Sequence, residues 1–196
     1  LMTGLGIDRT INCYSMLPWN NELHYRDGST GRFVDVTADP GTPAFEALWE
    51  PFLTDFTGHL REKGWLGRTN IAMDERSPEE MTDALGLLRK TAPELGIAMA
   101  DNKNSYLNYP FINSMCVKVR DRVPPQHIAE RRAQGFITTY YVCCSDRFPN
   151  MFTFSAPAEA VYAGWYTAAC GYDGFLRWAY NSWVGEPLTD SRFRTF

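Results

Sequence analysis

The 196-residue chain lacks the basic runs typical of nucleic-acid-binding proteins and the long apolar runs typical of membrane proteins. It has no run rich in lysine and arginine, and its formal net charge is -4, so it has no basic footprint of the kind that binds nucleic acid. No stretch reaches the roughly 18 apolar residues that span a bilayer, and the first residues lack the charged and apolar regions of a signal peptide. Nucleic acid and membrane are therefore not expected partners.

Cysteine and histidine are few and are spaced poorly for metal binding. The five cysteines contain no C-x-x-C pair and are odd in number: Cys13, Cys116, Cys143, Cys144 and Cys170. No two of the three histidines have the spacing of metal ligands. Free, mostly buried thiols are the expected state of the cysteines.

Aromatic residues and chain length indicate one packed domain, residues 1–196. Hydrophobic residues make up 44% of the chain and aromatic residues 14%, enough for one core and too short a chain for two ordinary ones. The aromatic rings are interpreted mainly as core. Some are also candidates for a sugar-binding surface, because an aromatic face covers the apolar C–H surface of a pyranose.

Strand-like and helix-like segments alternate along the sequence. The predicted strands are Thr10 to Leu17, Asn70 to Met73, Gly96 to Asp101, Ser114 to Val119, Gly135 to Val142 and Gly174 to Tyr180. The predicted helices are Ala44 to Lys63, with Pro51 as a kink or second start, Pro78 to Thr91, Pro125 to Gln134 and Ala156 to Ala169. A small hairpin is expected around Asp27 and Phe33.

This alternation predicts an α/β fold with a parallel sheet built from right-handed βα units. Two arrangements fit six strands: an open doubly wound sheet, and a (β/α)8 TIM-barrel-like fold that is partial and lacks its first two strands. The pattern alone leaves both open.

Polar and aromatic residues follow the predicted strands. They are Trp19 and Asn20; Asp74, Glu75 and Arg76; Asp101 and Asn102; Lys118 and Arg120; Tyr140 and Tyr141; and Arg177, Trp178, Tyr180, Asn181 and Trp183. Such a concentration at the carboxyl ends of strands is typical of an active face. Each single member also has an ordinary alternative: Asp101 as a turn residue, Arg177 as an ion-paired residue and the tryptophans as core.

The Asp74–Glu75 pair ends an apolar strand and precedes the helix-capping signal Ser77-Pro78-Glu79-Glu80. A solvated helix N-terminus is the plain alternative for these acids. Two adjacent acids on one side of a glycosidic bond do not fit the usual opposed acid and base, which lie about 5 to 9.5 Å apart. They do fit substrate-assisted cleavage, in which the sugar's 2-acetamido oxygen attacks the anomeric carbon. One carboxylate holds the acetamido N–H, and one carboxylic acid protonates the leaving oxygen.

Four parts of the sequence resemble the catalytic domain of glycoside hydrolase family 123, and together they extend over nearly the whole chain. They are CYSMLPWN from Cys13, IAMDER from Ile71, YYVCC from Tyr140 with PNMFTF from Pro149, and GFLRWAYNSW from Gly174. The resemblance implies a (β/α)8-like barrel, with strands 3 to 8 present here. It also implies removal of terminal β-linked N-acetylgalactosamine with retention, through an oxazoline-type intermediate, without metal or cofactor.

By position, the resemblance implies that Asp74 stabilises the acetamido group and that Glu75 is the general acid and later the base. It assigns the acetamido carbonyl to Tyr140 or Tyr141. The other substrate-binding candidates are Trp19, Asn20, Trp165, Arg177, Trp178, Tyr180 and Trp183. A glycan containing N-acetylhexosamine is the implied partner, and a bacterial, exported protein is the implied source.

Family members carry further domains and earlier barrel strands, so a longer parent chain is expected. Two alternatives stay open at this point. One is a carbohydrate-binding barrel fragment without catalysis, and the other is a hydrolase of the same mechanism acting on another hexosamine-containing glycan.

Overall fold

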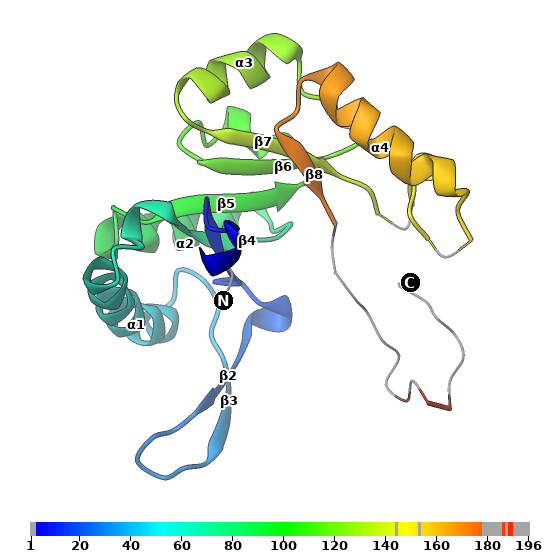
Figure 1. Ribbon diagram of the computed structural model, residues 1–196. Helices are drawn as coiled ribbons and strands as arrows, with labels where there is room; N and C mark the ends of the chain where they lie inside the picture. Colours follow the sequence, from blue (N-terminus) through cyan, green and yellow to red (C-terminus); the bar gives the residue numbers. More distant parts are fainter. Residues whose placement is uncertain (1–2, 144, 153, 178–185, 187, 190–196) are drawn as a thin grey trace. The chain divides into compact units, whose positions relative to one another are not determined.

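The computed structural model describes residues 3–143, 145–152, 154–177, 186 and 188–189. The chain divides into two compact units, Leu1–Met99 and Ala100–Phe196. In Figure 1 the colours run along the sequence, so that the first unit is blue to green and the second green to orange.

Three parallel strands form the sheet of the first unit, in the order β1, β4, β5. Their bounds are β1 (Ile11–Tyr14), β4 (Thr69–Met73) and β5 (Gly96–Asp101), which reaches the boundary of the unit. Every residue of β4 is buried, as expected for a central strand covered on both faces. Asn70 of β4 donates a hydrogen bond from Nδ2 to Asn12 Oδ1 at 2.8 Å. A β-carbon at Gly96 would overlap the Asn70 side-chain oxygen, which explains the glycine there.

Two helices of this unit, α1 (Pro43–Glu62) and α2 (Pro78–Thr91), pack against each other. Pro51 lies within α1, which runs as one helix, so the predicted second start is not found. The predicted capping box of α2 is confirmed. Ser77 Oγ accepts from the Glu80 backbone N–H, and a Glu80 carboxylate oxygen accepts from the Ser77 N–H at 3.0 Å. The Ser77 hydroxyl also donates to the Glu80 carboxylate at 2.8 Å, and this bond, followed by that from the Ser77 N–H, lowers the pKa of Glu80.

An antiparallel hairpin, β2 (Glu22–Arg26) and β3 (Phe33–Thr37), is inserted between β1 and α1. It extends from the rest of its unit as a separate ribbon (Figure 1). Asp27 Oδ1 accepts from Ser29 and Thr30 in the turn, and these bonds lower the pKa of Asp27 to about 2. The expected hairpin is thereby confirmed.

The second unit contains a parallel sheet in the order β6, β7, β8. The strands are β6 (Ser114–Lys118), β7 (Ile137–Tyr141) and β8 (Gly174–Leu176), and the helices are α3 (Pro125–Ala133) and α4 (Pro157–Cys170). Helix α3 packs on β7 and α4 packs on β8, and both lie on the same face of this sheet (Figure 1). Short 3-10 turns complete the two units at Thr3–Leu5, Trp19–Asn21, Leu66–Arg68 and Ser105–Leu107.

The order of elements confirms the predicted α/β fold with parallel strands joined through helices, as in part of a TIM barrel. Within each unit, successive strands of the parallel sheet are neighbours, without the reversal of order that defines a doubly wound sheet. None of the helices in the described ranges combines the length and hydropathy of a bilayer-spanning segment.

A buried arginine organises the core of the second unit. Arg131 of α3 is 5% exposed. It donates to Thr138 Oγ1 at 3.0 Å, to the Ile112 carbonyl at 3.0 Å and to the Ile137 carbonyl at 3.3 Å. Burial lowers the pKa of Arg131. Its hydrogen bonds thus join α3 to the start of β7 and to the segment before β6.

Replacing Arg131 by methionine is expected to destabilise the protein by about 2 to 4 kcal/mol, because the buried acceptors would lose their donors. Urea unfolding followed by circular dichroism measures this change. The control is Arg61→Met, which removes only an exposed ion pair with Glu94 and is expected to cost less than about 1 kcal/mol. Equal losses in the two variants would contradict the assignment.

Candidate active site

Asp74 and Glu75 directly follow β4 at its carboxyl end, and both are half-buried. The strand before them is fully buried, so the backbone that carries them is fixed by the sheet. Three residues later α2 begins at its capping box. The pair therefore occupies a short connection held at both ends, and it precedes the helix as the sequence predicts.

The register of β4 indicates which face of the sheet Asp74 shares. Asn12 pairs with Asn70 and Tyr14 pairs with Ala72, and residues paired in a parallel ladder lie on the same face. Asn12 and Tyr14 are exposed, whereas Ile11 and Cys13 between them are half-buried. Continuing the alternation by two residues places Asp74 on the face where β1 exposes its side chains.

Arg76 ties the loop that follows β1 to the acids. Its Nε donates to the Leu17 carbonyl at 3.1 Å, and its Nη2 donates to the same oxygen. Its guanidinium carbon lies 4.3 Å from the centre of the Trp19 ring, within the range of a cation–π interaction. Trp19 is 68% exposed, so its ring is available to a ligand beside the acidic pair.

Two residues near Trp19 have special positions. Asn20 is exposed, with φ 61° and ψ 14°, a left-handed conformation that asparagine tolerates better than most residues. Tyr14, 55% exposed, is the last residue of β1. The sequence reasoning overlooked Tyr14 because it extended this strand to Leu17; the polar–apolar alternation ending at Tyr14 was the signal that could have found it.

The structure separates the two tyrosines proposed for the acetamido carbonyl. Tyr140 is 0% exposed, and its hydroxyl donates to the Ala163 carbonyl of α4 at 2.7 Å. Its ring packs between Tyr166, Tyr172 and Phe175, and burial raises its pKa. Tyr140 is therefore a core residue under α4, and its hydroxyl is already used within the second unit.

Tyr141 lies on the opposite face of β7, because side chains alternate along a strand. It is half-buried at the carboxyl end of β7, in register with Lys118 at the carboxyl end of β6. Both side chains thus occupy the face away from α4. Of the two tyrosines, Tyr141 is the one whose position fits a ligand.

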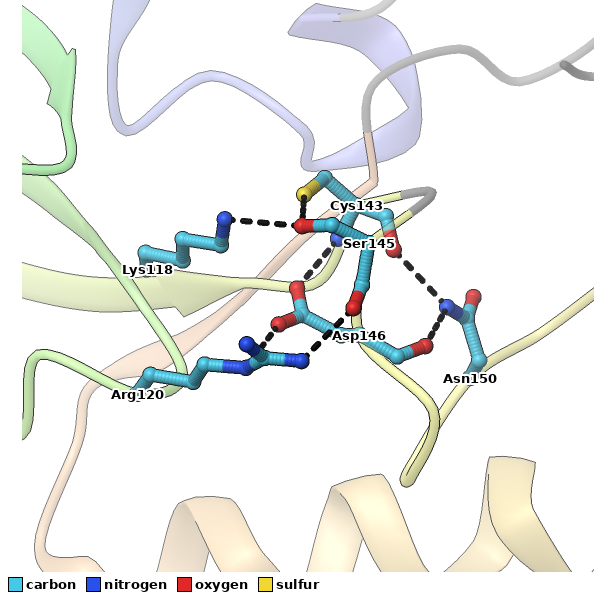
Figure 2. A network of polar contacts seen from close by, with 6 residues as sticks. All are labelled: Lys118, Arg120, Cys143, Ser145, Asp146 and Asn150. Carbon is cyan, nitrogen blue, oxygen red and sulfur yellow. Dashed lines mark hydrogen bonds and ion pairs between the residues drawn. The ribbon is translucent and has the colours of Figure 1, made fainter.

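The loop after β7 is fixed by a network around Asp146, shown in Figure 2. Asp146 Oδ2 accepts from the Cys143 N–H at 2.8 Å. Asn150 donates from Nδ2 to the carbonyls of Cys143 and Asp146 at 2.9 and 2.7 Å. Arg120 Nε lies 2.9 Å from Asp146 Oδ1, an ion pair that is not aligned as a hydrogen bond. The loop that borders Tyr141 is consequently preorganised.

The other residues predicted to contact substrate lie in different environments. Trp165 is 74% exposed in the middle of α4. It is about 200° around the helix from Ala163, which is buried, so it lies on the exposed side of α4, and its proposed sugar contact stays a prediction. Arg177 is half-buried directly after β8. Trp178, Tyr180 and Trp183 lie outside the described residues.

Asp101 and the cysteines behave as ordinary structural residues. Asp101 is 1% exposed, and its Oδ2 accepts from the Ser105 N–H at 2.7 Å, which is the turn role considered for it. Cys116 and Cys170 are buried, Cys13 and Cys143 are half-buried, and all four are free. Burial raises the pKa of Cys116 to about 12. Within the described ranges, no group of three or more His, Cys, Asp or Glu residues could hold a metal ion.

Acidic residues at the carboxyl end of a parallel strand, beside an exposed tryptophan, are features of the sugar-cleaving barrel enzymes. The family model for the glycoside hydrolase 123 catalytic domain matches residues 1–196. The chain belongs to this family.

One solved structure is that of a family 123 glycoside hydrolase from Clostridium perfringens, described in terms of glycolipid glycan hydrolysis. It is 31% identical to this chain, with a TM-score of 0.83, over 95% of this chain. This chain spans 35% of the length of that chain. No curated protein matches.

A double-mutant cycle tests the contact between Arg76 and Trp19. Arg76→Met, Trp19→Leu and the double variant are expected to show a coupling of about 0.5 to 1 kcal/mol in unfolding free energy, the size of an exposed cation–π pair. Amide exchange should also accelerate around Leu17 in Arg76→Met, because its carbonyl loses two donors. Additive effects, with unchanged exchange, would contradict the contact.

Proposed function

We propose that this chain is the catalytic part of a retaining, exo-acting glycoside hydrolase that releases terminal β-linked N-acetylgalactosamine. The observation that carries the proposal is the adjacent pair Asp74 and Glu75 at the end of a fully buried strand. Family membership supports glycosidic chemistry. The adjacency of the two acids supports a substrate-assisted mechanism. When both carboxyl groups lie on one side of the glycosidic bond, neither can attack from the opposite side, and the substrate must supply the nucleophile.

In the proposed first step the acetamido carbonyl oxygen attacks the anomeric carbon, and the bond to the leaving oxygen breaks. Glu75 gives its proton to the leaving oxygen. Asp74, ionised, accepts a hydrogen bond from the acetamido N–H and stabilises the positive charge that develops on the forming oxazoline. Among the described residues of the first unit, no side chain hydrogen-bonds the Asp74 carboxylate, so its oxygens are available to the substrate.

In the second step Glu75, now ionised, takes a proton from water as the water oxygen attacks the anomeric carbon. The oxazoline opens, and two displacements at one carbon give net retention. Trp19 is proposed to cover an apolar sugar face, and Asn20 and Arg177 to bind hydroxyl groups. Tyr141 is proposed to donate to the acetamido carbonyl in preference to Tyr140, whose hydroxyl donates to the Ala163 carbonyl.

Two other functions are separated from this one by measurement. Calorimetry with N-acetylgalactosamine beside a release assay identifies a glycan-binding domain without catalysis, which would bind and not release. Aryl glycosides of N-acetylgalactosamine and N-acetylglucosamine, compared at equal concentration, separate the galacto from the gluco sugar. We expect release, with preference for the galacto substrate.

Glu75→Gln is expected to lower turnover by about 10² to 10⁴-fold on substrates with poor leaving groups, since no proton reaches the departing oxygen. Activated aryl glycosides, whose leaving groups need little protonation, should lose much less. Steady-state kinetics on both substrate types measures the difference. Glu79→Gln, an exposed residue of α2, is the matched control and should retain activity. Equal loss on both substrate types would remove Glu75 as the acid.

Asp74→Asn is expected to lower kcat by about 10² to 10³-fold on substrates that carry a 2-acetamido group, because the developing charge loses its counter-charge. The comparison is with the exposed Asp55→Asn on α1, which should leave kcat unchanged. An unaltered rate in Asp74→Asn would rule out the substrate-assisted step.

A further inference from the structure

We propose that Lys118 binds an anionic substituent of the glycan, a carboxylate or a sulfate ester, and so gives the protein a preference for acidic glycans. The inference rests on the proposed function in taking a glycan as the ligand, and it adds the chemical class of that glycan.

The first support is position. Lys118 is the last residue of β6 and pairs with Tyr141, the last residue of β7. Val117 pairs with Tyr140, whose ring faces α4, so Lys118 and Tyr141 share the other face of the sheet. Lys118 is therefore a cation at the carboxyl end of a strand, on the face where Tyr141 is proposed to contact the sugar.

The second support is the charge balance around the Lys118 ammonium. Nζ donates to Ser145 Oγ at 2.9 Å, a neutral partner. Within the described residues of the second unit, no carboxylate lies within ion-pair distance of it, in contrast to Arg120, which pairs with Asp146. An ammonium has three protons to donate, so two remain for a ligand. An ammonium without a counter-charge is bound more strongly by an anion than by a hydroxyl group, because the hydrogen bond then joins two charged groups.

The third support is that Lys118's partner is held in place (Figure 2). The Ser145 carbonyl accepts from Arg120 Nη2 at 2.6 Å, and its Oγ lies 3.1 Å from Cys143 Sγ. Asp146 accepts from the Cys143 N–H, and Asn150 donates to the Asp146 carbonyl. Because Ser145 is immobilised, it restrains the end of the lysine, and less side-chain entropy is lost when a ligand binds.

The fourth support is the net charge of the two connections at this end of the sheet. Residues 118–124 and 142–150 contain four cations and two anions, namely Lys118, Arg120, Arg122 and Arg147 against Asp121 and Asp146. The Glu159 carboxylate of α4 also meets this loop, accepting from the Asn150 N–H at 2.8 Å, which leaves an excess of one positive charge. The whole chain carries a formal net charge of -4. The excess of positive charge is thus local, and a local field of this sign attracts acidic ligands.

Calorimetry on the full chain tests the inference with five probes. They are N-acetylgalactosamine, its 4-sulfate, its 6-sulfate, and disaccharides in which it is β-linked to glucuronate or to glucose. We expect at least one acidic sugar to bind about tenfold or more tightly than its neutral counterpart at low salt, a ratio typical of one charged hydrogen bond, and the ratio to shrink at high salt. The sulfated sugars report a sulfate ester, and the glucuronate disaccharide reports a carboxylate.

Lys118→Met should abolish this preference while changing the affinity for the neutral sugars less than about twofold, and Lys118→Arg should keep part of it. Lys63→Met, which removes an exposed lysine after α1, is the matched control and should keep all of it. Equal affinity of the wild type for acidic and neutral sugars would overturn the inference, as would no detectable binding of any acidic sugar. A preference that survives in Lys118→Met, or an equal loss for both sugar classes, would also overturn it.

A release assay with a neutral aryl β-N-acetylgalactosaminide keeps the two proposals apart. Turnover without a preference for acidic sugars would refute the Lys118 inference and leave the proposed reaction standing. A preference for acidic sugars that depends on Lys118, without any turnover, would support the Lys118 inference and refute the proposed reaction.

Discussion

The guanidinium of Arg76 joins the ends of β1 and β4 immediately beside the two acids. One side chain binds the Leu17 carbonyl through two nitrogens and lies against the Trp19 ring. Because Arg76 directly follows Glu75 in the chain, this contact restrains the backbone beside the acids. In the first unit, the guanidinium of Arg76 thus connects the proposed catalytic pair to Trp19 and to the loop after β1. Its hydrogen-bond acceptor, the Leu17 carbonyl, is neutral.

In the second unit, a carboxylate rather than a guanidinium holds the loop that follows a strand. Asp146 binds the backbone of its own loop and pairs with Arg120, and Asn150 closes the other side. The arrangement satisfies the one carboxylate among the network residues and leaves Lys118 with only a hydroxyl group. The same set of hydrogen bonds thus holds the loop after β7 and, within the described part of the second unit, leaves the Lys118 ammonium at the end of β6 without a counter-charge.

Sequence periodicity predicted the elements well, because strands of a parallel sheet and capped helices have strong local signals. The buried run before Asp74 and the Ser77–Glu80 capping box are examples. The two tyrosines of β7 show where such reasoning stops: adjacent residues of one strand face opposite sides, and only packing against α4 decides which is buried. The exposure of Trp165 could not be predicted for a related reason, since its side of α4 depends on which helix face meets the sheet.

The hairpin formed by β2 and β3 closes on itself at its base. Ala38 donates its backbone N–H to the Asn21 carbonyl at 3.0 Å, and the Asn21 amide binds Asp39 at 2.9 Å. An insertion whose two ends are joined in this way can lengthen, shorten or change its tip without disturbing the residues that precede and follow it. Trp19 and α1 can therefore keep their places when the tip of the hairpin is changed, which makes the tip a suitable position for grafting a new binding surface onto this unit.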